Sequence, residues 1–324
     1  MISVRNVARA AVVAAMVLLA AGAVQAVNIE TVPVGNPGNA ADYTGYGSVA
    51  YTYNIGKYEV TAGQYTAFLN AVAKTDTYGL YYTDMSRTDY GSGIAQSGSS
   101  GSYAYSVDAN FVNRPVNCVS FWDACRFANW LNNGQQGAGT TEYGAYTLTS
   151  DGIANNTITR NTGAQWAVTS EDEWYKAAYH KNDGMTGNYW DYPTSSNTAP
   201  GRDMADASGN NANYYTGASP YPIDNDKYTT LVGEFENSDS PYGTFDQGGN
   251  VEEWNEAIIS GSYRLGRGGV FSSVTGTLRA EIRHDYRYPT DEVSFVGFRV
   301  SEVPEPATMS LLALGGLLAL RRRR

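Results

Sequence analysis

Cysteine and histidine are nearly absent from the 324 residues. There are two cysteines, Cys118 and Cys125, and two histidines, His180 and His284. Two cysteines cannot build a disulfide framework. They could form one bridge if their side chains meet, or remain as two buried thiols. Two histidines exclude a multi-histidine metal site, and the chain has no G-x-S-x-G motif to signal a nucleophilic serine.

Basic residues are few in the body of the chain. Six of the 22 lysines and arginines are arginines near the two ends, which leaves 16 basic residues against 32 acidic ones. This surplus of negative charge repels nucleic acids and anionic membrane surfaces, so neither is an expected partner of the body. It is typical of a soluble exported protein or of a protein that binds cations.

Hydrophobic runs are short and lie at the ends. The first, Ala10–Ala21, follows Arg5 and Arg9 and precedes Val24-Gln25-Ala26, a small-x-small cleavage pattern. This order predicts a signal peptide over residues 1–26. The alternative, a transmembrane anchor, would need a longer apolar run.

The other end reads VPEPATMSLLALGGLLALRRRR. As a helix, its apolar part would span about 21 Å, less than the roughly 30 Å of a bilayer core. The Pro-Glu-Pro triplet, apolar stretch and basic end of residues 304–324 resemble the PEP-CTERM sorting signal of Gram-negative bacteria. The resemblance implies processing by an exosortase-type peptidase and delivery to the cell envelope, outer surface or extracellular matrix. A retained membrane anchor is the alternative.

Residues 27–303 are predicted to form one α+β domain, rich in loops and poor in regular secondary structure. Capping boxes predict helices that begin after Thr61, Ser120 and Ser170. The predicted strands are 50–58, 146–148, 165–169, 263–271 and 296–300. The long segments 76–112 and 182–230 are rich in Tyr, Ser, Gly and Asn, a composition typical of adaptable binding surfaces, unless they are plain insertions.

Six sequence blocks resemble, in order, those of the formylglycine-generating enzyme (sulfatase-modifying factor) family. They are IGKYEVTAGQYTAFLNAVA, RPVNCVSFWDACRFANWLNNGQ, TSEDEWYKAAYH, DQGGNVEEWNE, RLGRGGVFSS and VGFRVS. The resemblance covers about residues 53–301. It implies an irregular relative of the C-type lectin fold, but family membership alone does not fix a function.

The enzymes of this family use copper(I), held by two cysteines after a Gly-Gly turn, and molecular oxygen to convert a sulfatase cysteine to formylglycine. Counted from Gly268-Gly269, the cysteine positions are occupied by Ser273 and Leu278. Because copper(I) requires soft thiolate ligands, copper is not expected and the catalytic positions are degenerate. A serine nucleophile is also disfavoured, since no base lies beside it in sequence.

The resemblance also implies two structural calcium sites, since calcium takes six to eight oxygen ligands. The first would use the side chains of Asp246 and Glu253 and the carbonyls of Gly249 and Val251; the alternative is a metal-free turn. A second site, whose spacing crosses a loop, would use Asn213 and Asp224 with the carbonyls of Tyr214 and Asp226.

The family binds its substrate in a cleft below the Gly-Gly turn. The resemblance places four residues there, namely Ser272, Ser273, Arg279 and Arg283. Salt bridges from the arginines to Glu281 or Asp285 are the alternative. We therefore expect an exported, non-catalytic surface or matrix protein that binds a glycan or protein ligand and touches the membrane only through its tail. The alternative function is a formylglycine-generating oxidase or a related oxidoreductase.

Overall fold

The computed structural model describes residues 26–217, 222–283 and 286–303. The predicted signal peptide up to residue 25 and the sorting tail from residue 304 lie outside the described residues, as do His284 and Asp285. Within the described ranges, no helix is long and apolar enough to cross a membrane.

The three predicted helices are confirmed. They are α2 (Ala62–Val72), α3 (Phe121–Asn132) and α5 (Glu171–Tyr179). In α2, Thr61 Oγ1 accepts from the Gln64 N–H at 3.2 Å, and Gln64 Oε1 accepts from the Thr61 N–H at 2.9 Å. Ser120 and Ser170 cap α3 and α5 in the same reciprocal way, and each cap stabilises its helix by about 1 kcal/mol. The sequence did not predict the short helix α4 (Ser150–Ala154).

The strands are short and form two four-stranded sheets and a hairpin. The first sheet has the order β1-β2-β10-β5, the second β8-β7-β6-β9, and β3 pairs with β4. Their bounds are β1 Thr31–Val34, β2 Tyr53–Gly56, β3 Ile94–Ser97, β4 Ala104–Val107, β5 Trp166–Val168, β6 Glu252–Ile259, β7 Tyr263–Arg267, β8 Tyr286–Arg287, β9 Val296–Phe298 and β10 Val300–Glu302. In the second sheet β6 runs parallel to β9 and antiparallel to β7.

One predicted strand, 146–148, is wrong. Tyr146 is held by side chains instead of a ladder: its N–H donates to Asn129 Oδ1 at 2.7 Å and its hydroxyl to Glu256 at 2.5 Å. Three other predicted strands exist but are shorter; 263–271, for example, ends as β7 at Arg267. The predicted strand 296–300 is divided between β9 and β10, which belong to different sheets. The sequence missed β6, whose buried glutamates and asparagine do not alternate with apolar residues.

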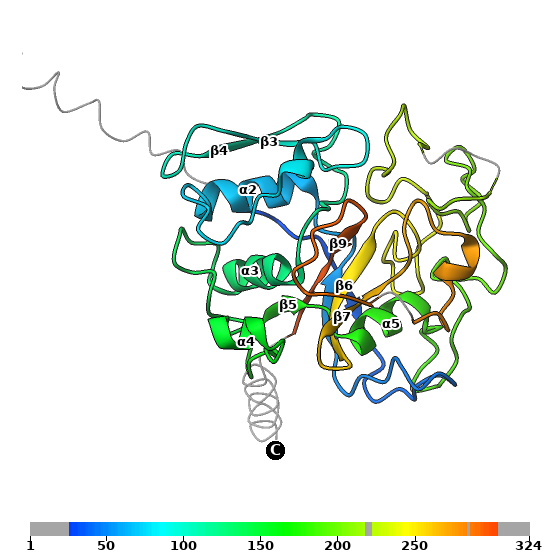
Figure 1. Ribbon diagram of the computed structural model, residues 1–324. Coiled ribbons are helices and arrows are strands. Elements are labelled where there is room, and N and C mark those ends of the chain that lie inside the picture. Colours follow the sequence, from blue (N-terminus) through cyan, green and yellow to red (C-terminus); the bar gives the residue numbers. More distant parts are fainter. Residues whose placement is uncertain (1–25, 218–221, 284–285, 304–324) are drawn as a thin grey trace, which may run out of the picture.

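The main hydrophobic core lies where α2 and α3 pack beside the sheets. Phe68 contacts Phe127 and Trp130 with ring centroids 5.4 and 5.3 Å apart, and Phe127 contacts Phe298 of β9 at 5.4 Å. Figure 1 shows α2 and α3 on one side of the central strands β6, β7 and β9, with the loop-rich chain that follows α5 on the other side. The polar residues of the candidate site lie on or next to the second sheet.

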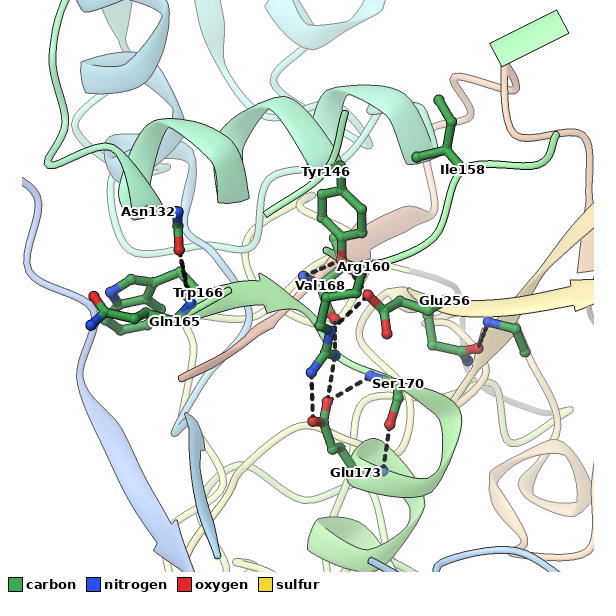
Figure 2. Close-up of polar contacts among 12 residues, drawn as sticks. Asn132, Tyr146, Ile158, Arg160, Gln165, Trp166, Val168, Ser170, Glu173 and Glu256 are labelled. Atoms are coloured by element: carbon green, nitrogen blue, oxygen red, sulfur yellow. Dashed lines mark hydrogen bonds and ion pairs between the residues drawn. The ribbon is translucent and has the colours of Figure 1, made fainter. Parts of the chain in front are cut away.

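A buried ionic network fixes α5 against β6 (Figure 2). Arg160 donates to both carboxylate oxygens of Glu173 at 2.8 Å and to Glu256 of β6 at 2.9 Å. The same Glu173 accepts from the Ser170 N–H, so the helix cap and the ionic network share one carboxylate.

Candidate functional site

The Gly-Gly turn that follows β7 packs against a second Gly-Gly turn that precedes β6. Gly268 and Gly269 have φ values of 100° and 72°, a region that favours glycine. The Gly249 N–H donates to the Gly268 carbonyl at 2.9 Å, and the Phe271 N–H donates to the Asn250 carbonyl at 3.0 Å. The structure thus brings together the two blocks that the sequence singled out for metal chemistry.

Ser273 closes the turn. Its hydroxyl accepts from the Val270 N–H at 3.0 Å, and its own N–H donates to the Val270 carbonyl at 2.8 Å. The Ser273 carbonyl also accepts from the Tyr215 N–H at 2.7 Å, which ties the long 182–230 segment to the turn. The serine at the first family cysteine position therefore has a structural role.

Leu278, at the second family cysteine position, is fully buried. It ends the 3₁₀ turn η2 (Thr275–Leu278) and packs with Tyr192, Ala212 and Tyr214. Its carbonyl accepts from the Tyr179 hydroxyl at 3.1 Å. An apolar side chain in an apolar cluster supplies no metal ligand, so the turn has neither of the soft donors that copper(I) requires.

The two cysteines are free thiols in the main core. They therefore lie in a different hydrophobic cluster from Leu278, the residue at the second family cysteine position. Burial raises the pKa of Cys118 to about 12 and the pKa of Cys125 well above its ordinary value. Both thiols are therefore neutral near pH 7. They are not joined in a disulfide, so the alternative of two buried thiols holds.

The arginines expected in the cleft form ion pairs. Arg279 contacts Glu281 at 2.9 Å and Asp191 at 3.3 Å, so the salt-bridge alternative holds for this residue. Arg283 contacts Glu171, at the start of α5, at 2.7 and 3.0 Å. Ser272, which was also expected in the cleft, is partly exposed.

Glu253, predicted as a calcium ligand, is the counter-charge of a buried arginine. Its Oε2 accepts from Arg299 Nε at 2.5 Å and from Trp174 Nε1 at 2.7 Å, and its Oε1 accepts from Arg299 at 2.6 Å. The Glu253 and Arg299 side chains are both fully buried. Arg299 also donates to the carbonyls of Gly56 and Phe245 at 2.9 Å, so it links both sheets to the turn. This arrangement fits a structural ion pair better than a calcium ligand.

Near this ion pair lie two further carboxylates, the buried Glu59 and the partly buried Asp246. Asp246 accepts from the Gly233 N–H at 2.6 Å, and burial raises its pKa to about 6. Glu59 Oε1 accepts from Asn250 Nδ2 at 3.1 Å, whereas its buried Oε2 has no hydrogen-bond partner within the described part of the chain. Burial, and then the charge of Asp246, raise the pKa of Glu59 well above its usual range. No sequence pattern marks Glu59 as a site residue, because it lies 187 positions before Asp246.

The two side chains predicted for the second calcium site, Asp224 and Asn213, make separate contacts. Asp224 forms an ion pair with the buried Arg114, and its other oxygen accepts from Asn225 at 2.8 Å. Asn213 donates to the Tyr228 carbonyl at 2.8 Å, while its buried Oδ1 has no partner in the described ranges. Of the predicted side-chain ligands, Asn213 alone offers a free buried oxygen. Throughout 26–217, 222–283 and 286–303, no three Asp, Glu, His or Cys side chains converge as metal ligands.

Glu59 also lines a large cleft with a volume of about 870 Å³. Its walls come from residues 26–30, the first turns of α2, Glu59 and the segment 231–234. Sequence reasoning missed it, because its walls come from segments far apart in the chain.

Comparisons with known proteins identify the family and the fold. The sequence matches the sulfatase-modifying factor enzyme 1-like domain over residues 4–303 and the PEP-CTERM protein-sorting motif over residues 302–324. No curated protein matches the sequence.

Two solved structures show the same fold. CarF has 21% identity and a TM-score of 0.56, covering 86% of this chain and 100% of its own. Variable protein 1 of Treponema denticola has 18% identity and a TM-score of 0.52, covering 87% of this chain and 98% of its own. The sorting motif marks the chain for export and exosortase processing. The chain therefore belongs to the sulfatase-modifying factor enzyme 1-like family and adopts its irregular α+β, C-type-lectin-like fold.

Proposed function

We propose that this chain is a non-catalytic member of its family that binds a glycan or protein ligand at the outer surface or in the extracellular matrix of a Gram-negative bacterium. The observation that carries the proposal is the chemistry of the Gly-Gly turn. Ser273 accepts a turn hydrogen bond and Leu278 is buried among apolar side chains. A hard hydroxyl and a hydrocarbon cannot hold copper(I).

Oxygen consumption tests the loss of catalysis. We expect the protein to consume no more oxygen with copper(I) and a sulfatase-derived cysteine peptide than the same mixture without protein. An active member of the family serves as the positive control. Sustained turnover of the peptide would favour the oxidase alternative and overturn the proposal.

The 76–112 segment supports the choice of a ligand-binding role. Tyr78 is 47% exposed and lines a cavity of about 190 Å³. Tyr82, in the same segment, is also exposed. Exposed tyrosines supply large contact area at low cost in conformational entropy, which suits recognition of sugars and protein surfaces.

We expect Tyr78→Ala to weaken binding of the mature body to its best ligand on a glycan or protein array by about tenfold, the loss typical of one aromatic contact of ~1.4 kcal/mol. Tyr143→Ala, which removes a tyrosine that is 58% exposed outside this segment, is the matched control. Equal binding by the two variants would remove the segment from the ligand site.

Calcium remains a prediction. An ion at Asp246 would compete with the Gly233 N–H, and one at Glu253 would have to displace Arg299. At calcium concentrations about 100 times the Kd, binding would stabilise the native state by about 2.7 kcal/mol. We therefore expect a higher melting temperature with calcium than with EDTA. Identical melting curves, together with no calcium in the purified protein, would remove both sites.

A further inference from the structure

The cleft of about 870 Å³ is lined by both apolar and polar groups, and its charged side chains are acidic. Two apolar side chains at the cleft, Val112 and Leu231, are exposed to solvent at 36% and 38%. The charged side chains among the described lining residues are glutamates, namely Glu30, Glu59 and Glu234, with no lysine, arginine or histidine. The volume lies in the range of natural small-ligand pockets, which combine apolar walls with a few polar groups.

One of these glutamates has an unused oxygen. Glu59 is only 2% exposed, and its Oε2 forms no hydrogen bond within the described residues. Glu30 differs, because it is half exposed and already paired with Lys57 at 2.9 Å. A buried carboxylate oxygen without a donor is costly in a folded protein, and a ligand that donates to it would remove that cost.

The surroundings of Glu59 specify the charge of the missing donor. Its other oxygen accepts from Asn250, and the nearby Asp246 accepts from the N–H of Gly233 in the cleft wall. An anionic ligand would be repelled by Asp246, whereas a cation would be attracted and would favour the ionised form of Glu59, against the burial that raises its pKa. The apolar walls favour an organic cation over a hydrated inorganic ion.

We propose that this cleft binds an ammonium group carried on an apolar stem, such as an alkylamine or a lysine side chain, with Glu59 as its counter-charge. The stem packs along the apolar wall that includes Ala67 of α2 and Leu231, and the ammonium donates to Glu59 Oε2. The cleft is separate from the tyrosines of the 76–112 segment, so this inference does not rest on the ligand proposed for them.

Ligand-observed NMR titrations with n-hexylammonium test the proposal on residues 26–303 carried behind an N-terminal tag, so that Ala26 stays in the cleft wall and no α-ammonium is created at Val27. We expect a Kd of about 1 mM or tighter for the seven non-hydrogen atoms of this probe. Hexan-1-ol, which lacks the charge, should bind at least about tenfold more weakly, and hexanoate should not bind. Equal binding of the alcohol and the ammonium, or no binding of the ammonium, would overturn the proposal.

Three variants locate the site. Glu59→Gln keeps the size of the side chain and should weaken n-hexylammonium binding at least about tenfold. Glu236→Gln makes the same charge change at an exposed position outside the cleft and should leave binding unchanged. If Glu59→Gln proves unfolded by circular dichroism, Ala67→Phe, which narrows the cleft at the apolar wall without changing its charge, should weaken binding at least about tenfold. Wild-type affinity in folded Glu59→Gln or in Ala67→Phe would refute the assignment.

Discussion

Arg299→Met is expected to destabilise the protein by about 3–5 kcal/mol, the range seen when one partner of a buried ion pair is removed. The fully buried Glu253 carboxylate would lose its counter-charge, and the carbonyls of Gly56 and Phe245 would each lose a donor. Urea denaturation followed by tryptophan fluorescence measures the change, because the buried Trp174 donates to the same carboxylate.

Two further variants separate the buried charge from general loss of an arginine. Arg279→Met removes an arginine whose side chain is 35% exposed and should cost less than about 1 kcal/mol. Glu253→Gln combined with Arg299→Met removes both charges and should recover part of the loss. If Arg299→Met costs no more than Arg279→Met, the ion pair is not the link between the sheets and the turn.

Local features of the sequence predicted the helices well, because a capping box needs only residues three positions apart. Thr61 with Gln64 is one such pair, and the structure forms both of its hydrogen bonds. Strands were predicted less well, since their partners are remote. Tyr146 has the β-favouring character of a strand residue, yet its hydroxyl lies against Glu256 of β6, 110 positions away.

The candidate site could be located from the sequence but not fully described. The Gly-Gly turn and the replacement of both family thiols were evident from spacing alone. The role of Glu253 was not, because Arg299 lies 46 positions later and reaches it only in the folded chain. No local pattern marked Glu59, because its proposed role depends on a buried oxygen that has no hydrogen-bond partner among the described residues. Pairing across the fold decides whether an acidic residue acts as a ligand or as a counter-charge.

Arg160→Met should have an effect of similar size, about 3–5 kcal/mol at pH 7. The guanidinium neutralises Glu173, which is fully buried, and Glu256, whose side chain is 17% exposed. Without it, two carboxylates would remain in the interior between α5 and β6 (Figure 2). Urea denaturation at pH 7 measures the loss, and Arg87→Met, which removes a surface pair with Asp89, should leave the stability close to that of the wild type.

The pH dependence of this loss distinguishes charge from packing. Burial alone would raise the pKa of Glu173, but the charge of Arg160 and its hydrogen bonds outweigh burial and keep that pKa lowered. The wild-type contribution is therefore present above the unfolded glutamate pKa of about 4.3 and is lost as the pH falls through the folded value. In Arg160→Met the pKa of Glu173 should rise instead, so that protonation stabilises the variant as the pH falls. The difference between the two proteins should shrink from pH 7 to pH 4, whereas a loss due to packing alone would stay constant.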